Sequence, residues 1–489
     1  KSIKAVEPSF AAVLLLFRVT KPQKRKPNFA WSLLCVSVFF LGLNLSYWSM
    51  VQVNKYILTE YVCVWGDETS EMIRSDYRNL LTTPVNINFA SKMLFDTDKI
   101  ARRKHIEQRP LTAKDERVLK ELGILRTQQV LQPLEAQYDK IVLLVLESVH
   151  RDYIGFYNKN IPQETTPFLD SLLAKYPRLD NYYSSAIPTT QGLNATFRSH
   201  LIFDEEINGA KQGSLFRSVQ EAGWRGIFMN ASSQYYSNEV REYPQQFGMQ
   251  EYYAKEYLQD LGYSGWGYHN DVLYKETLRL LEAGRKDKML LVTKTLDMHQ
   301  PYPYYGISWE NMPPAVRDHE LVTIRGMYWV DQTLKNFFEE AEAKGLMDDR
   351  TLFIITADHN PHSGGEYTKI VTNENDRKSI APIPLLFVSK NLQPLNNLMT
   401  KDYASQIDLA PTLLYLAGLK APEDFMGRNL LESVETPFAL GYFGGKAFYY
   451  SADLSFEDQM DNPSPATEYE DALTNYIIHE YSERQLKNQ

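Results

Sequence analysis

Three short polar sites, each directly after an apolar run, could together hold one divalent metal ion. Glu147 follows the run IVLLVL, Thr189 and Thr190 follow YYSSAIP, and Asp358 and His359 follow LFIITA. Two carboxylates, a hydroxyl and an imidazole form a ligand set that suits zinc or manganese. The chemistry that this set predicts is a threonine hydroxyl activated by a metal ion.

Strand-like runs alternate with helical stretches from residue 138 onward. IVLLVLE, WRGIFMN, MLLVTKTL, TLFIITAD and IPLLFVS are typical of buried strands, whereas TPFLDSLLAKY, VDQTLKNFFEEAEAKGL and DLAPTLLYLAGL have helical spacing. This alternation predicts an α/β fold with a mostly parallel sheet sandwiched by helices. Because the carboxyl ends of parallel strands meet at one edge of a sheet, the polar sites would come together there.

The two threonines lie where a helix is expected to begin, in SAIPTTQGLNATFRSHL. A helix N-terminus offers free N–H groups and the positive end of the helix dipole, which favour a bound phosphate and a deprotonated oxygen. A threonine at this position could also serve only as an N-cap. On these grounds Thr189 and Thr190 are both candidates.

The order, spacing and flanking sequence of these motifs resemble the alkaline phosphatase and sulfatase superfamily, over roughly Tyr138 to Leu431. The resemblance is to its membrane-anchored phosphoglycerol and phosphoethanolamine transferases, in particular lipoteichoic acid synthase. It implies an alkaline phosphatase/sulfatase-like fold and a divalent metal, manganese or zinc. The metal ligands that it implies are Glu147, Thr189, Asp358 and His359.

The resemblance also favours Thr189 over Thr190 as the catalytic nucleophile. In the transferases the nucleophile stands three residues before a small residue, and Gly192 lies three residues after Thr189, whereas Leu193 lies three after Thr190. No cysteine or serine is followed by x-Pro-x-Arg, which disfavours a sulfatase that uses formylglycine.

Further stretches extend the resemblance to substrate contacts. TKTLDMHQPYPY places His299 where the family has a histidine that contacts the phosphate or donates a proton, although a structural loop histidine is the alternative. Arg241, in FMNASSQYYSNEVREYPQQFG, is a candidate phosphate contact or else a surface arginine. Asn360 replaces the usual glycine after Asp-His and should alter the following turn, where His362 is an additional candidate contact. WGYHNDVLY, IDLAPTLLYLAG and FMGRNLL also resemble the family and are expected to serve the fold.

An uncharged stretch, Phe29 to Val53, predicts an N-terminal transmembrane helix. About 25 residues at 1.5 Å each cross a hydrocarbon core of about 30 Å, and the basic residues before the stretch predict a cytoplasmic N-terminal side. We therefore predict five segments along the chain. They are the end of a preceding span and a basic cytoplasmic loop (1–28), the transmembrane helix (29–53), a juxtamembrane helical linker (54–137), a sulfatase-like catalytic domain (138–445) and an acidic C-terminal tail (446–489).

Composition narrows the function further. A net charge of −9 argues against a nucleic-acid partner. The chain has only two cysteines, Cys35 and Cys63, so we do not predict a disulfide framework. Because the phosphoethanolamine transferases that the chain resembles usually carry several disulfides, the phosphoglycerol transferases are the better match.

The resemblance implies transfer of a phosphoglycerol (or phosphoethanolamine) head group to a glycan or lipid acceptor in the cell envelope. The donor would be a phospholipid, phosphatidylglycerol or phosphatidylethanolamine, and the reaction would pass through a phosphothreonine. The implied location is the cytoplasmic (inner) membrane of a bacterium, with the catalytic domain facing the periplasm or the outside. Two alternatives stay open: a phosphodiesterase, phosphatase or sulfatase-type hydrolase that uses the same site, and an inactive lipid-binding envelope protein.

Overall fold

The computed structural model describes residues 110–125, 135–202, 212–234, 238–258, 267–299, 307–362, 365–372, 378–456 and 468–487. Its main sheet has six strands in the order β4-β3-β5-β1-β6-β7. These strands are β1 (Lys140–Leu146), β3 (Arg225–Asn230), β4 (Glu251–Tyr253), β5 (Met289–Lys294), β6 (Thr351–Ala357) and β7 (Leu385–Val388). Neighbouring strands are parallel except for β6 and β7, which are antiparallel.

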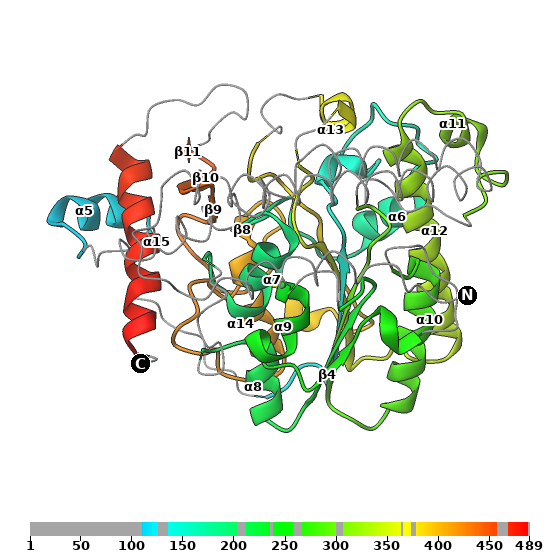
Figure 1. Ribbon diagram of the computed structural model, residues 1–489, viewed down its shortest axis with the longest axis horizontal. Helices are drawn as coiled ribbons and strands as arrows, with labels where there is room; N and C mark the ends of the chain where they lie inside the picture. The colour runs from blue at the N-terminus through cyan, green and yellow to red at the C-terminus, as the bar shows by residue number, and fades with distance from the viewer. Residues whose placement is uncertain are drawn as a thin grey trace, which may run out of the picture. The chain divides into compact units, whose positions relative to one another are not determined.

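Helices cover both faces of this sheet. On one side α6 (Pro167–Lys175), α10 (Asn270–Ala283) and α12 (Val322–Ala343) pack together (Figure 1). On the other side lie α7 (Thr189–Arg198), α8 (Leu215–Glu221), α9 (Asn238–Phe247) and α14 (Leu409–Leu416). Shorter helices are α11 (Pro314–Arg317) and α13 (Gly365–Ile370). The predicted α/β fold with a mostly parallel, helix-covered sheet is confirmed.

Continuous apolar runs form the central strands, as strands buried on both faces require. All residues of β5 and β6 are buried, and so is β1 apart from its first residue. The predicted runs around WRGIFMN and IPLLFVS likewise contain β3 and β7. The strands are therefore held in place by side chains on both sides, which gives their carboxyl ends a rigid foundation.

The strand register brings the predicted carboxylates side by side. Leu146, the last residue of β1, is paired with Ala357, the last residue of β6. Glu147 and Asp358 are the next residues along each strand, so they leave the same edge of the sheet as direct neighbours. The pairing of these two parallel strands thus brings together two residues that lie far apart in the sequence.

The same register places a lysine beside these carboxylates. Val145 is paired with Lys294 on β5 and with Thr356 on β6, and paired residues in parallel strands point to the same face. Because side chains two residues apart share a face, Glu147 and Asp358 point to that face too. The long side chain of Lys294 can therefore reach both of them.

A smaller antiparallel sheet follows near the end of the chain. It contains β9 (Phe438–Phe443), β10 (Lys446–Ser451) and β11 (Ser455–Phe456). Gly444 and Gly445, with φ of 61° and 86°, form the two-residue turn between β9 and β10, a conformation that glycine adopts without strain. The predicted boundary between residues 445 and 446 needs correction, because it separates two strands of one hairpin.

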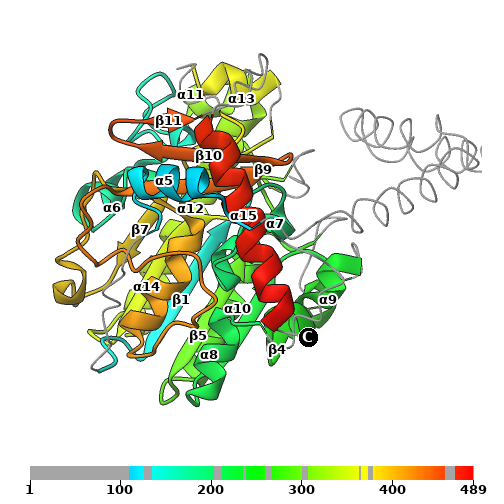
Figure 2. The same cartoon turned by 90° about the vertical axis from the view of Figure 1, so that its left-hand side faces the viewer.

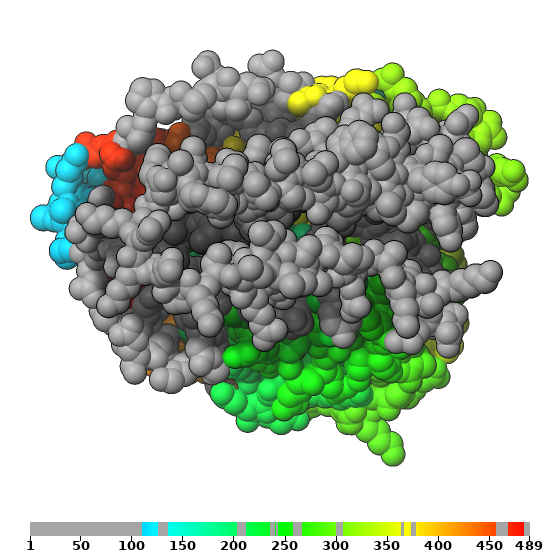
Figure 3. Space-filling model, in the orientation of Figure 1, coloured from blue at the N-terminus to red at the C-terminus, as the bar shows by residue number. Residues whose placement is uncertain are grey.

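The C-terminal helix packs against a helix from the start of the described region. Helix α15 (Glu468–Lys487) contacts both β10 and α5 (Ala113–Glu121), as Figure 2 shows. Buried side chains join the two helices, and Arg117 Nη2 lies 3.0 Å from Glu468 Oε1. Figure 3 shows the atoms of α5 and α15 next to each other at one edge of the view. Helix α5 lies within the predicted linker, where DERVLKE supplies the helical pattern.

The predicted transmembrane segment, residues 29–53, lies outside the described residues, as do residues 1–28 and most of 54–137. In the part of the chain that the structure describes, no helix has the length and apolar character needed to cross a membrane.

Candidate active site

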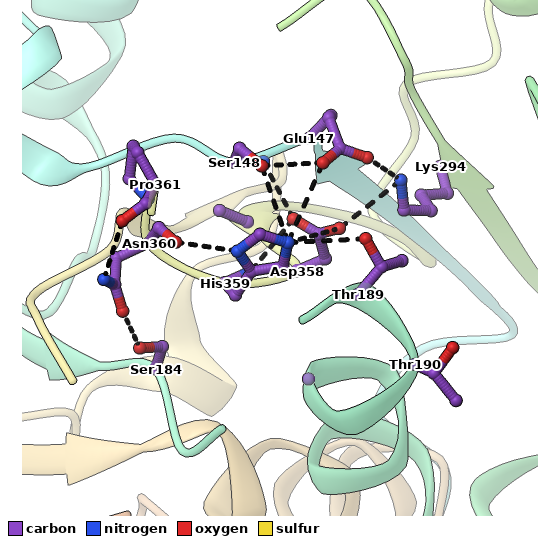
Figure 4. Close-up of polar contacts among 12 residues, drawn as sticks. Glu147, Ser148, Ser184, Thr189, Thr190, Lys294, Asp358, His359, Asn360 and Pro361 are labelled. Atoms are coloured by element: carbon purple, nitrogen blue, oxygen red, sulfur yellow. Dashed lines mark hydrogen bonds and ion pairs between the residues drawn. The ribbon is translucent and has the colours of Figure 1, made fainter. Parts of the chain in front are cut away.

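Glu147, Asp358 and His359 form a compact buried cluster at the carboxyl ends of β1 and β6 (Figure 4). One potential ligand atom from each residue lies within 4.8 Å of the others. His359 Nε2 is 3.8 Å from Glu147 Oε1 and 3.6 Å from Asp358 Oδ2. Three of the four predicted metal ligands are therefore close enough to share one ion.

Thr189 is the first residue of α7 and faces this cluster. Its Oγ1 lies 3.3 Å from His359 Nε2, whereas Thr190 Oγ1 lies 2.8 Å from the hydroxyl of Tyr243 on α9. Figure 4 shows Thr189 next to His359 and Thr190 directed away. The ten-residue helix α7 also presents its N-terminus, the positive end of its dipole, toward the cluster. This geometry favours Thr189 over Thr190 as the reactive hydroxyl.

The hydrogen bonds around Asp358 and His359 leave two acceptor atoms directed at the same point. Asp358 Oδ1 accepts the N–H groups of Ser148 (2.8 Å) and His359 (2.9 Å). Asp358 Oδ2 is buried and accepts no hydrogen bond from the described residues. His359 Nδ1 donates to the carbonyl of Asn360 at 2.7 Å, which fixes the ring and directs Nε2 at the cluster. A buried carboxylate oxygen and an imidazole nitrogen placed in this way fit a divalent ion such as zinc or manganese.

Ser148 is part of the cluster and was not predicted. Its hydroxyl donates to Glu147 Oε1 at 2.6 Å and lies 3.5 Å from His359 Nε2. Its φ of 50° is in the left-handed region, which is uncommon for residues other than glycine. This backbone conformation turns the Ser148 N–H toward Asp358 while its hydroxyl stays on Glu147. In the sequence, a serine after the strand-ending glutamate has the pattern of an ordinary turn residue.

Lys294, the last residue of β5, was also missed. Its ammonium donates to Glu147 Oε2 and lies 3.4 Å from Asp358 Oδ2. Burial acts to raise the pKa of Glu147, but the charges of Lys294, His299 and His359 outweigh it, so the pKa lies well below its usual range. Burial acts to lower the pKa of Lys294, yet the two carboxylates raise it overall. Glu147 and Lys294 are therefore an ion pair at neutral pH.

Asn360, the departure from the family's usual glycine, fixes the loop that follows β6. Its Oδ1 accepts from the Ser184 hydroxyl and from the N–H of Ala381 (3.1 Å). Its Nδ2 donates to the carbonyls of Pro361 (3.2 Å) and Ser379 (3.3 Å). These side-chain bonds fix the segment whose backbone carbonyl orients His359, so the substitution is compatible with the cluster.

Replacing Asn360 with glycine should destabilise the fold by roughly 1–3 kcal/mol, because the change leaves buried donors and acceptors without their partner. Chemical denaturation at neutral pH would measure the loss. Asn397→Gly, at an exposed loop position, is the control and should cost much less. Equal stability losses for the two variants would contradict a role for the Asn360 side chain.

Gly192 allows α7 to approach the end of β6. A Cβ atom at this position would lie 1.9 Å from the carbonyl oxygen of Asp358, a contact that no side chain can make. Gln406 holds that carbonyl from the other side, since its Nε2 donates to Asp358 O at 2.6 Å. Gly192 therefore sets the distance between the helix that carries Thr189 and the strand that carries Asp358.

Gly192→Ala should push α7 away from the cluster and reduce activity by about a hundredfold, because an ångström of misplacement is costly to a positioned nucleophile. Initial rates of the purified variant and of the parent protein would show the effect. In the control Gly226→Ala, the added Cβ comes no closer than 3.3 Å to a neighbour, so activity should change little. A Gly192→Ala variant as active as the parent protein would show that the close approach is not needed.

His299 lies in the loop after β5 and lines a pocket above the cluster. The pocket is lined by Glu147, Ser148, Tyr153, Pro188, Thr189, Met298, His299, His359, Pro361 and His362. The loop is anchored by Asp297, which is buried and accepts from Trp329 Nε1 at 2.6 Å and from the Asn270 N–H at 2.9 Å. His299 is thus held within the same pocket as the nucleophile candidate.

For Arg241 the structure gives only the helix to which the residue belongs. It belongs to α9, which packs against α7, but its side chain lies outside the described residues. The phosphate contact assigned to Arg241 therefore stays a prediction.

The fold is that of the alkaline phosphatase superfamily. A solved member of that superfamily from Vibrio parahaemolyticus superposes with a TM-score of 0.59 at 18% identity, covering 78% of this chain and 99% of that chain. The lipoteichoic acid synthase LtaP from Listeria monocytogenes superposes with a TM-score of 0.59 at 16% identity, covering 76% of this chain and 98% of that chain.

Sequence comparison then identifies the family. The family model described as Sulfatase matches residues 139–419, more than half of the chain, and the chain belongs to this family. Curated relatives include lipoteichoic acid synthases from Staphylococcus aureus (23% identical over 350 residues) and Staphylococcus saprophyticus (25% over 366 residues). These alignments cover 64% and 67% of this chain but 51% and 53% of the relatives, so the chain spans about half of their length.

Proposed function

We propose that this protein transfers a phosphoglycerol, or phosphoethanolamine, head group from a phospholipid to a glycan or lipid acceptor of the cell envelope. The observation that carries the proposal is the position of Thr189 Oγ1. It lies at the N-terminus of α7 and 3.3 Å from His359 Nε2, the histidine that shares the cluster with Glu147 and Asp358. A hydroxyl held between a metal-binding cluster and a helix N-terminus suits attack on a phosphodiester.

Glu147, Asp358 and His359, together with Thr189, would hold a divalent ion, zinc or manganese. Such an ion supplies Lewis-acid chemistry, which lowers the pKa of a neighbouring hydroxyl and offsets the charge of a phosphate. The protein's own part is to keep the four groups in place. The N–H groups of Ser148 and His359 fix Asp358, and the Asn360 carbonyl fixes the ring of His359.

The reaction that we propose has two displacements. In the first, Thr189 Oγ bonds to the lipid phosphorus, its hydroxyl proton passes to water, and the bond from phosphorus to the diacylglycerol oxygen breaks. His299, which lines the same pocket as Thr189, would protonate that leaving oxygen. In the second, an acceptor hydroxyl attacks the phosphothreonine and gives its proton to His299, while the Thr189 oxygen leaves and takes a proton from water.

The relatives named lipoteichoic acid synthase support a synthetic reaction over a hydrolytic one. We further propose that the segment 29–53 anchors the catalytic domain at the outer face of a bacterial cytoplasmic membrane. An anchor would keep the site near its lipid donor and raise the effective donor concentration.

Head-group release from fluorescent phosphatidylglycerol and phosphatidylethanolamine tests the proposal. The detergent-purified full chain would be incubated with each lipid and with manganese or zinc. Fluorescent diacylglycerol from one lipid would identify the donor, and a labelled phosphoprotein would indicate the covalent step. Binding of metal without diacylglycerol from either lipid would reject the lipid transferase in favour of a hydrolase of soluble esters. Binding of lipid with neither metal nor turnover would indicate the inactive envelope protein.

A further inference from the structure

Lys294 lies in an unusual place for a lysine. Its side chain is 3% exposed, and its ammonium donates to Glu147 Oε2 and to the carbonyl of Thr295 at 3.2 Å. The third neighbour is Asp358 Oδ2, at 3.4 Å. The close-up in Figure 4 shows the ammonium between the two carboxylates, on the side opposite His359. The ammonium is thus directed at the cluster of Glu147, Asp358 and His359 and away from solvent.

Two buried carboxylates at neighbouring strand ends require a positive charge. Glu147 is 1% exposed and Asp358 is fully buried, so water cannot solvate them. Burying a carboxylate without a partner is strongly unfavourable, and two adjacent ones also repel each other. Lys294 supplies one positive charge that does not depend on any bound ion. Glu147, Asp358 and Lys294 together then carry one net negative charge, which a bound metal ion would offset.

The hydrogen bonds also limit how many ions can bind. Lys294 occupies Glu147 Oε2, and two backbone N–H groups occupy Asp358 Oδ1. Glu147 Oε1, Asp358 Oδ2 and the Thr189 hydroxyl remain directed at His359 Nε2. These four atoms provide the ligands of one ion. A second ion that bridged the same two carboxylates, about 3.5–4 Å from the first as in two-metal sites, would meet the ammonium of Lys294, which holds Glu147 Oε2 and lies 3.4 Å from Asp358 Oδ2.

We propose that Lys294 is a resident counter-cation that balances one of the two buried carboxylates, so that the site takes one divalent ion and not two. The proposal rests on the metal site of the proposed function and specifies its composition. Lys294 acts through Glu147 and Asp358 and is a positioning residue.

The first test is made without metal. Lys294→Met removes the charge at similar length, and it should lower the melting temperature in EDTA. The double variant Lys294→Met/Glu147→Gln removes one charge of each sign, so it should melt closer to the parent protein than Lys294→Met does. Lys288→Met, which removes an exposed lysine before β5, is the matched control and should have little effect. If Lys294→Met fails to fold, recovery of a folded double variant still supports the proposal.

The second test counts ions by equilibrium dialysis against Mn²⁺ and elemental analysis. The parent protein should bind one ion at saturation. Lys294→Met, which lacks the competing positive charge, should bind its first ion about tenfold more tightly or take up a second. Lys294→Arg keeps the charge and should bind one ion only.

Several results would overturn the inference. Two ions in the parent protein, an unchanged melting temperature of Lys294→Met in EDTA, or a double variant no more stable than Lys294→Met would each do so. One ion bound equally by the parent and by Lys294→Met would reject the role of Lys294 alone. A parent protein that binds no divalent ion would instead reject the metal-dependent function, and this inference with it.

Discussion

Thr189→Ala should abolish diacylglycerol release, by at least about a thousandfold, while Thr190→Ala keeps most of the activity. The reason is geometric: Thr189 Oγ1 faces His359, whereas Thr190 Oγ1 is engaged by the Tyr243 hydroxyl. Initial rates on the fluorescent donor lipid, with manganese or zinc at saturation, would measure the difference. The labelled phosphoprotein should disappear in the Thr189 variant only.

Two controls separate loss of the nucleophile from loss of the fold. Thr189→Ser keeps a hydroxyl at the same position, so partial activity should remain. Thr189→Ala should also keep the melting temperature of the parent protein, because the N-terminus of α7 has no side-chain cap hydrogen bond that the change could remove. Loss of activity in Thr190→Ala with retention in Thr189→Ala would reverse the assignment of the nucleophile.

Asp358→Asn should remove both the bound metal and the activity. The amide would turn either an oxygen or an N–H group toward the point where Asp358 Oδ2 now lies. With its oxygen needed by the N–H groups of Ser148 and His359, the amide would direct an N–H group at Lys294 and at the ion. Metal affinity should fall by at least about a hundredfold. Elemental analysis after gel filtration in metal-poor buffer would show it.

The matched control is Asp287→Asn, at a half-exposed carboxylate before β5. It should retain the metal content of the parent protein and its rate on the donor lipid. A chelator should inhibit the parent protein, and added manganese or zinc should restore the rate. Full metal content in Asp358→Asn would mean that the ion binds elsewhere or through other ligands.

The strands were predictable because burial on both faces imposes a simple pattern. IVLLVL is apolar without interruption and TLFIITA is interrupted only by threonine, and runs of this kind are typical of interior strands. The residue after each run was then expected at one edge of the sheet, which is where Glu147 and Asp358 lie. Local sequence was sufficient here because parallel pairing places the carboxyl ends of neighbouring strands at the same edge of the sheet.

The parts that were missed depend on contacts between distant segments. Lys294 ends an apolar run, and a lysine at that point normally reaches solvent. Only the register of β5 against β1 turns it toward two carboxylates. The left-handed backbone of Ser148 likewise results from the bonds that its N–H and hydroxyl make to Asp358 and Glu147.

The C-terminal boundary was misjudged for a related reason. The prediction of an acidic tail from residue 446 rested on composition, which does not reveal the glycine pair that turns β9 into β10. The asparagine at position 360 was expected to alter the turn. The four hydrogen bonds of its side chain could not be predicted, because Ser184, Ser379 and Ala381 come from elsewhere in the chain.

The contact between α5 and α15 determines where the protein can be cut for expression. Val118, Leu119 and Leu122 pack with Leu473 and Ile477 of α15 in one buried cluster. A recombinant fragment that begins at Tyr138, where the family resemblance starts, would lack α5 and expose those apolar side chains of α15. Such a fragment should aggregate on purification, whereas one that begins near residue 106 and keeps the chain through residue 487 should stay monodisperse.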